Sequence, residues 1–154
     1  MSNRVFTWMA AVVLGTAACN DSTSPPPEVP LEQQVWASSL GIDLGSMTKL
    51  PSGVYYKDTV VGAGGTATAT STVKVYYTLW LANGTKVESN VGGATPASFP
   101  VASLIEGWKI GIPGMKVGGT RRLVIPSALA YGAQGSGSIP GNANLVFDIQ
   151  LTGL

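Results

Sequence analysis

The clearest pattern along the chain is an alternation of apolar and polar positions between residues 73 and 81. One set of alternate positions is Val73, Val75, Tyr77, Leu79 and Leu81, and the other is Lys74, Tyr76, Thr78 and Trp80. A period of two is typical of a β-strand with one face buried. Asn83-Gly84 follows directly and favours a two-residue hairpin turn, which predicts a return strand over Thr85–Ser89.

Two more strands and one helix complete the predicted body. Thr120–Ile125 is rich in apolar residues and stops at a proline, and Leu145–Leu151 places an apolar side chain at every second position. Between them, residues 104–110 favour a helix because Ile105, Trp108 and Ile112 have the spacing of one helical face. The predicted fold class is therefore α+β, with a twisted antiparallel β-sheet wrapped around one short α-helix.

The chain before this body has weaker patterning. Residues 31–44 show a loose helical pattern in Val35, Leu40 and Leu44, which predicts a partly helical lead-in over 35–49 ahead of a domain at 50–154. Ser22–Pro30 contains four prolines and no apolar period, so residues 19–34 are predicted to form a flexible tether.

The N-terminus has the features of an export signal. Arg4 precedes an apolar run over Val5–Gly15, which is shorter than the roughly 20 residues of a membrane span. The small residues that follow lead to Cys19, and this arrangement resembles the lipobox of bacterial lipoproteins, although Thr16 stands where leucine is usual. We therefore expect a signal peptide over 1–18, lipidation of Cys19, and a lipid-anchored protein of the cell envelope that faces the periplasm or the exterior. The alternative is an ordinary signal peptide cut near Ala18.

Composition excludes several kinds of chemistry. Of 154 residues, 45% are hydrophobic and 11% charged, with a net charge of +1 and no histidine. The commonest general base and metal ligand is therefore absent, and we expect no metal and no cofactor. Arg121-Arg122 is the nearest approach to a basic patch, so nucleic acid is not an expected partner. Gly62–Ala67 matches a dinucleotide-binding fingerprint in letters only, because a strand and not a helix is predicted to follow.

A glycine-rich stretch between two aromatic residues is the main candidate for a binding site. It runs from Tyr131 to Phe147, and Tyr77, Phe99 and Trp108 lie on or near the predicted strands and helix. Each aromatic alone is typical of a protein core, whereas all five together with a glycine-rich rim also fit an apolar cup with polar tips.

The motifs as a set resemble the FKBP-type peptidyl-prolyl cis–trans isomerases. The resemblance covers residues 50–154 and is carried by segments in the order Leu50–Lys57, Val73–Thr78, Asn83-Gly84, Leu104–Trp108, Met115–Gly119, Pro126, Ala130–Gly132, Ile139-Pro140 and Leu145–Asp148. It implies an isomerase that acts on proline-containing polypeptides, needs no cofactor and takes macrolide inhibitors; with the N-terminal export signal, its expected role is to assist the folding of exported proteins at the cell envelope.

The resemblance also implies which residues form the site. The catalytic set would be Tyr77, Glu88, Ile105, Trp108, Tyr131 and Phe147, with Trp108 as the floor and with the Ile105 N–H and the Tyr131 hydroxyl binding substrate carbonyls. The substrate-binding set would be Val87, Phe99, Leu104 and Ile139, with Ile139 on an overhanging loop.

The chain departs from the family pattern after the predicted hairpin. The family usually has Phe-Asp-Ser there, and this chain has Val87-Glu88-Ser89. No arginine follows within Val91–Ala97, the loop before Ile139 is shorter by about one residue, and Ser136 stands where a histidine is sometimes found. These departures keep open a non-catalytic alternative, in which a chaperone or adhesion module holds proline-containing segments in the same cup.

Overall fold

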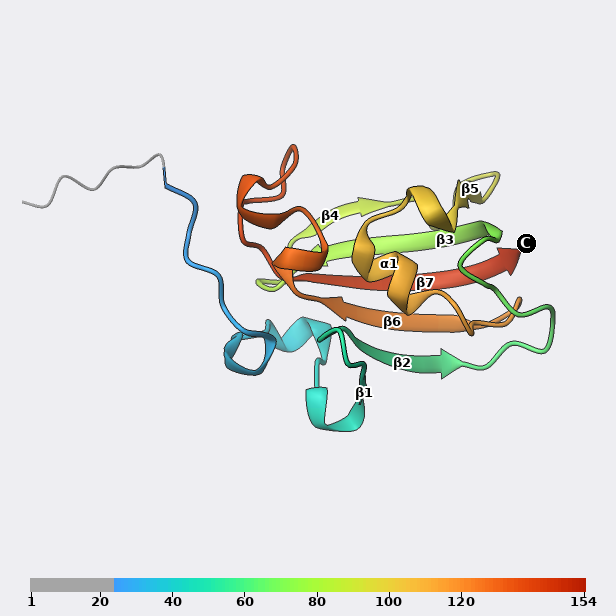
Figure 1. The fold of residues 1–154 in the computed structure, drawn as a ribbon, viewed down its shortest axis with the longest axis horizontal. Helices are drawn as coiled ribbons and strands as arrows, with labels where there is room; N and C mark the ends of the chain where they lie inside the picture. The colour runs from blue at the N-terminus through green and yellow to red at the C-terminus, as the bar shows by residue number, and fades with distance from the viewer. Residues whose placement is uncertain (1–23) are drawn as a thin grey trace, which may run out of the picture.

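One antiparallel sheet of seven strands forms the body of the molecule, in a computed structural model that describes residues 24–154 (Figure 1). The strand order is β1-β2-β6-β7-β3-β4, and β5 pairs with the start of β3 on the same edge that pairs with β4 further along. The strands are β1 (Thr48–Lys49), β2 (Tyr55–Val60), β3 (Thr72–Leu81), β4 (Lys86–Ser89), β5 (Ala97–Pro100), β6 (Thr120–Ile125) and β7 (Leu145–Gly153). The predicted fold class is confirmed. The predicted signal peptide and Cys19 lie outside the described residues.

The alternating segment of the sequence is β3, a central strand. Val73, Val75 and Leu79 are buried on its inner face, as the period of two predicts. β3 pairs along its length with β7, in a register that sets Tyr77 opposite Ile149 and Leu79 opposite Phe147. The two strands that carry most of the core therefore also place two aromatic side chains close together.

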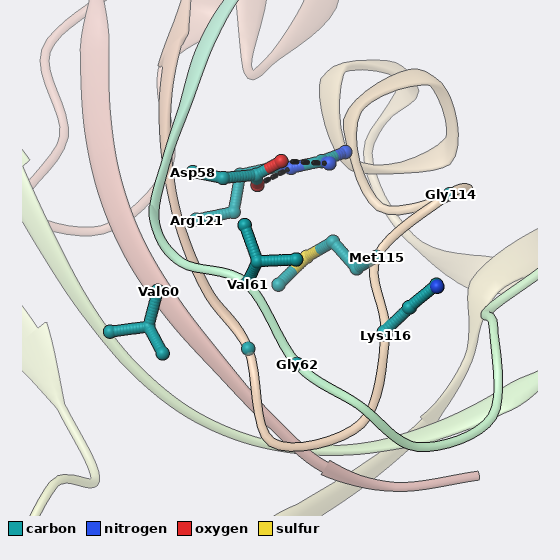
Figure 2. Close-up of a pocket in the computed structure, with 9 residues that line it drawn as sticks. Asp58, Val60, Val61, Gly62, Gly114, Met115, Lys116 and Arg121 are labelled. Atoms are coloured by element: carbon teal, nitrogen blue, oxygen red, sulfur yellow. Dashed lines mark hydrogen bonds and ion pairs between the residues drawn. The ribbon is translucent and has the colours of Figure 1, made fainter.

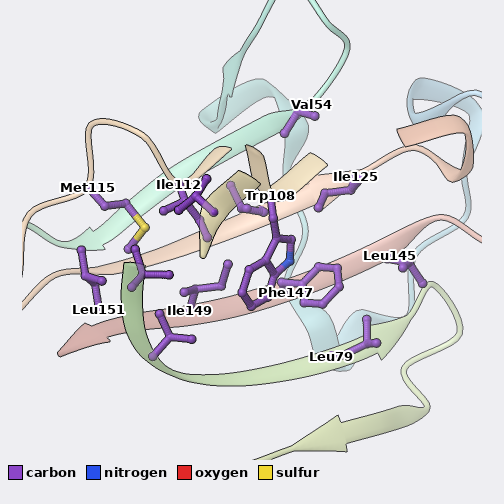
Figure 3. Packing of buried hydrophobic residues seen from close by; sticks show 14 of the residues in the cluster. Val54, Leu79, Trp108, Ile112, Met115, Ile125, Leu145, Phe147, Ile149 and Leu151 are labelled. Carbon is purple, nitrogen blue, oxygen red and sulfur yellow. The ribbon is translucent and has the colours of Figure 1, made fainter. Parts of the chain in front are cut away.

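The predicted helix is present but starts later than expected. It is α1 (Glu106–Gly111), with Ile105 at its N-cap and a 3-10 turn, η4 (Val101–Ser103), before it. α1 lies across the inner face of the sheet (Figure 1). Its two glycines permit this close approach, because a Cβ on Gly107 would clash with Ile125 and one on Gly111 would lie 2.7 Å from Leu123. Trp108 is thereby pressed into the core beside Phe147 (Figure 3).

The opposite face of the sheet is covered by the chain that precedes β1. A second, smaller core contains Leu31, Leu40, Tyr55, Val124 and Val146. Over 35–49, where the sequence favoured a partly helical lead-in, the chain forms two short 3-10 turns, η2 (Ser38–Leu40) and η3 (Leu44–Ser46), and another, η1 (Leu31–Gln33), precedes them.

The breaks between these turns have local causes. Gly41 has a φ of 57°, the left-handed conformation that ends η2. The Asp43 side chain accepts a hydrogen bond from the Gly45 N–H and thereby caps η3 as a separate turn. The helical pattern also misplaced Val35, which is 84% exposed, whereas its neighbour Trp36 packs against the second core.

Two loops differ in outcome. Gly62–Ala67 is an irregular loop in which Gly62 packs on the backbone of Lys116 and Val117, and Thr66 forms a single bridge to Lys116. No helix follows it, which agrees with the prediction of a turn rather than a nucleotide site.

The flexible tether expected over 19–34 needs correction for its last part, because residues from Pro26 onward form hydrogen bonds to the domain. Within residues 24–154, the structure contains no helix that is both long and apolar enough to cross a bilayer.

Candidate active site

Four aromatic rings meet edge to face between α1 and the sheet. The ring centroid of Trp108 lies 5.4 Å from that of Tyr77, 6.4 Å from that of Phe99 and 5.3 Å from that of Phe147. Interplanar angles of 83–88° make these three contacts T-shaped, which is a preferred geometry for aromatic pairs. Trp108 is 4% exposed, so it forms the base on which the other three rings stand.

A cavity of about 200 Å³ opens above these rings. Six separate parts of the fold contribute to it: β3, the strands β4 and β5 beside it, the start of α1, the loop after β6, and β7. Its lining residues are Tyr77, Leu79, Glu88, Phe99, Leu104, Ile105, Trp108, Tyr131 and Phe147. Because these elements are far apart in the sequence, the cavity exists only in the folded domain.

The structure brings together eight of the ten residues that the resemblance implied, and two lie elsewhere. Val87 is half-buried against the main core, and Ile139 is 7% exposed and belongs to that core. The backbone N–H and C=O of Ile139 both bond to Ser136, at 2.8 Å and 3.0 Å, in a tight bridge within the glycine-rich loop. Neither residue lines the cavity, and their contact with a substrate stays a prediction.

Two tyrosine hydroxyls and one carboxylate form the polar side of the cavity. The Tyr77 hydroxyl donates a hydrogen bond of 2.7 Å to Glu88 Oε1. Burial, with the Glu88 hydrogen bond adding to it, raises the pKa of Tyr77 well above its ordinary value. Burial also raises the pKa of Tyr131, and the charge of Glu88 acts in the same direction. Both phenols therefore stay protonated, and hence stay hydrogen-bond donors, at neutral pH.

The Ile105 N–H is a further donor at the cavity. As the N-cap residue of α1, Ile105 has no partner for this group within the helix. No backbone acceptor for it is found in the described part of the chain, where Leu104 N bonds to Val101 and Trp108 N bonds to Ile105. The N–H is therefore available to a carbonyl in the cavity.

Sequence reasoning missed two residues of the site. Leu79 lines the cavity and could have been found, because it shares the alternating face of Tyr77. Asn90 does not line it but holds Tyr77: its Oδ1 accepts from Tyr77 N at 2.6 Å, and its Nδ2 donates to Val75 O at 3.1 Å. The Asn90 N–H also bonds to Tyr77 O, so this residue continues the ladder on β3 beyond the end of β4. No pattern in the sequence indicates that role.

A second hollow, on the far side of α1, contains an ion pair (Figure 2). Arg121 forms two hydrogen bonds to Asp58, of 2.6 Å and 2.9 Å, and donates a third to Gly111 O at the end of α1. Its guanidinium also lies 4.3 Å from the centroid of the Tyr56 ring. Every part of this group is engaged, and its role is to fasten α1 to β2 and β6.

The second arginine of the basic pair is engaged in the same way. Arg122 binds both oxygens of Asp148 and the backbone oxygen of Leu40. Within residues 24–154, no three His, Cys, Asp or Glu side chains gather in a group that could hold a metal ion.

Comparison with known proteins identifies the family and the fold. Residues 64–152 match the family model described as FKBP-type peptidyl-prolyl cis-trans isomerase. The chain is 47% identical over 100 residues to the FKBP-type isomerase FkpA of Aeromonas hydrophila, a match that covers 65% of this chain and 37% of that protein. It is 41% identical over 102 residues to an FK506-binding protein of Neisseria meningitidis serogroup B, covering 64% of this chain and 94% of that protein.

Solved structures agree with these relatives. The crystal structure of FkpA from Escherichia coli superposes with a TM-score of 0.67 at 33% identity, over 75% of this chain and 54% of that one. A peptidyl-prolyl cis-trans isomerase from Pseudomonas syringae pv. tomato gives a TM-score of 0.66 at 29% identity, over 82% and 97%. The chain thus spans little more than a third of some relatives and nearly all of others. By family model, relatives and fold together, this chain belongs to the FKBP-type peptidyl-prolyl cis–trans isomerases.

Proposed function

We propose that this chain accelerates rotation about Xaa-Pro peptide bonds in exported proteins and so assists their folding at the cell envelope. The observation that carries the proposal is the aromatic cavity on Trp108, which is lined by apolar rings and has its hydrogen-bond donors at the edge. Such a cavity suits a proline ring together with the polar peptide groups on either side of it.

The reaction requires no bond to break. Rotation about the peptide bond has a barrier of about 18–20 kcal/mol, because amide resonance gives the C–N bond partial double-bond character. Resonance places charge on the carbonyl oxygen, and water stabilises that charge. An apolar cavity removes water from the bond and so favours the twisted, less polar amide.

The residues of the cavity divide the work between floor and edge. The proline ring would lie on Trp108, with Tyr77 and Phe147 as walls. The Ile105 N–H and the Tyr131 hydroxyl would donate to the carbonyls that flank the rotating bond. Glu88 would act indirectly, because it orients the Tyr77 hydroxyl and adds negative potential beside Tyr131.

A proline-limited refolding assay and a peptide isomerisation assay test this function. We expect catalysis that is proportional to protein concentration and is lost when proline peptides saturate the cavity. Peptide binding without rate enhancement would instead support the non-catalytic alternative, which the Val87-Glu88 departure keeps open. Neither binding nor turnover would contradict both proposals.

Ligand range and location are separate parts of the proposal. Several relatives carry the name FK506-binding protein, and we propose that macrolides of this class compete for the same cavity. In a variant whose other tryptophans are changed to phenylalanine, quenching of Trp108 fluorescence on titration with FK506 measures binding in the cavity. A proline peptide added to the same titration then measures the competition.

We also propose that Cys19 is lipidated and anchors the chain to a membrane. The support for this is the short apolar run and small residues before the single cysteine. Metabolic labelling with a fatty-acid analogue should mark the wild type and not Cys19→Ser. Equal labelling of both, or labelling of neither, would contradict the anchor.

A further inference from the structure

The segment that leads into and includes the first 3-10 turn lies along the loops that carry the rim of the cavity. We call residues 26–34 the brace; in Figure 1 the segment continues the blue trace beside the orange loops. Four side-chain hydrogen bonds connect the brace to residues 127–144: Ser127 Oγ to Glu28 Oε1, Asn142 Nδ2 to Pro26 O, and Asn144 Nδ2 to both Val29 O and Gln34 Oε1. Their lengths run from 2.7 to 3.0 Å, so all four have good geometry.

Asn144 is the buried centre of this contact. Its side chain belongs to a residue that is only 2% exposed, and all three of its hydrogen bonds are internal. Its Oδ1 accepts from the Ser127 N–H at 3.1 Å, while its two donors are used by the brace. The Asn144 amide therefore connects the brace and the start of β7 to Ser127, where the loop that bears Tyr131 begins; we call residues 127–144 the rim loop.

Asn142 reaches the rim more directly. It is the one non-glycine residue with a positive φ in the described chain, at 57°, a conformation that Asn tolerates better than most residues. Its side chain donates to Pro26 O at 2.7 Å, and its own N–H donates to Gly132 O at 2.8 Å. Gly132 follows Tyr131, so a single residue links the brace to the backbone beside the cavity hydroxyl.

The two stretches of chain approach each other closely at Gly141. A Cβ on Gly141 would lie 2.8 Å from Pro25 Cβ and would clash with the Ala133 carbonyl. The brace thus contacts both ends of the loop that bears Tyr131, through Ser127 before it and through Asn142 and Asn144 after it.

We infer that the brace positions the cavity rim, with Asn142 and Asn144 as positioning residues that hold Tyr131 in place for the substrate. The inference rests on the isomerase function proposed for the cavity. Neither asparagine touches the cavity, since neither is among its lining residues, and each acts through the backbone of the rim loop.

Asn142→Asp is the sharpest test. It keeps the shape of the residue and its tolerance of positive φ, but replaces the donor to Pro26 O with an acceptor. We expect kcat/KM for a proline peptide to fall about three- to tenfold, mainly through KM, because one hydrogen bond that orders the rim is replaced by repulsion. Amide exchange should accelerate at Gly135, Ser136 and Ile139, whose N–H groups bond within the rim loop.

Ser127→Ala is a second variant that leaves Asn144 in place. It removes only the bond to Glu28, since the Ser127 N–H still donates to Asn144, and a milder loss of the same kind is expected. The control is Glu32→Ala, which breaks two bonds of the same N-terminal segment, to Lys49 and Tyr55, away from the rim. In the full chain, we expect this control to lower the Tm and leave kcat/KM within twofold of wild type.

Two results would overturn the inference. One is a Tm loss in Asn142→Asp with unchanged kcat/KM and unchanged exchange of the rim amides. The other is an equal effect of Glu32→Ala on activity. If the wild type has no turnover, the proposed function fails on its own, and rim exchange together with peptide affinity still decides whether the brace positions the rim.

Discussion

The two faces of the sheet are covered in different ways. On the inner face, α1 and the long loops enclose a large apolar core and leave a cavity over Trp108. On the outer face, short 3-10 turns pack against the sheet and form a smaller core. Hydrogen bonds hold these turns in place, among them Tyr55 to Glu32 and Arg122 to Leu40 O. The difference places the cavity proposed for catalysis on the inner face, whereas the outer face is closed by packing that fixes the path of the chain.

Replacement of Trp108 by alanine should have the largest effect, because this residue is both the base of the core and the floor of the cavity. We expect a loss of about 3–5 kcal/mol in the free energy of unfolding and no measurable isomerisation. Denaturant unfolding and the peptide assay measure the two losses. A folded Trp108→Ala with normal turnover would break the link between inner core and chemistry.

Leu40→Ala is the corresponding truncation in the core of the outer face. Leu40 is buried in the second core, so the free energy of unfolding should fall by about 2–4 kcal/mol. Below the lowered Tm, kcat/KM should equal that of the wild type, because no residue of the second core lines the cavity. A loss of activity in the folded variant would mean that the two faces are coupled.

Tyr131→Phe separates chemistry from stability within the inner face. The hydroxyl is at the cavity edge and the ring is 36% exposed, so the Tm should change little. We expect kcat/KM to fall about tenfold, the effect of one lost hydrogen bond to substrate. An unchanged rate would remove the role assigned to the Tyr131 hydroxyl.

The smallest effect concerns pH. Hydrogen bonds from Lys49 and then Tyr55 lower the pKa of Glu32 from 4.5 to about 2. A lowered carboxyl pKa stabilises the folded state above pH 4.5, and this stabilisation is lost as the pH falls towards 2. Tm measured against pH should therefore drop in this window, and Glu32→Gln should flatten the drop.

Activity should respond to pH differently. Because the pKa values of Tyr77 and Tyr131 lie above 10, the cavity donors keep their protons at alkaline pH where an exposed tyrosine begins to ionise. We expect kcat/KM to stay level above neutral pH where an exposed tyrosine begins to ionise, whereas the Tm falls on the acid side.

The parts of the fold that could be predicted are those with a periodic pattern in the sequence. The alternation in β3 and β7 and the spacing in α1 place Tyr77, Phe147 and Trp108 on the inner face, and family motifs then supply the other residues of the cavity except Leu79. Glycine and proline positions also marked where strands and helix end. These patterns are repeated over many residues, so one exception does not hide them.

The parts that escaped prediction depend on single polar side chains. Asn90, Asn142 and Asn144 each use a side-chain amide to form a hydrogen bond with the backbone of another segment. An isolated asparagine is not part of a repeating pattern, so the sequence does not indicate such a role. The prolines at the start of the brace are typical of a loose linker, but side-chain amides of the domain bind the carbonyl oxygens of Pro26 and Val29. The burial of Ile139 likewise follows from a local bridge to Ser136 that the loop composition does not reveal.

The brace also sets a limit on reach. Docking begins at Pro26, which is only seven peptide steps after Cys19. A fully extended chain advances at most about 3.6 Å per residue, so these steps span no more than about 25 Å. If Cys19 is held at a membrane, Pro26 and the domain that follows it can be no further than about 25 Å from the anchor point. The substrates it can meet are then the chains that emerge beside it.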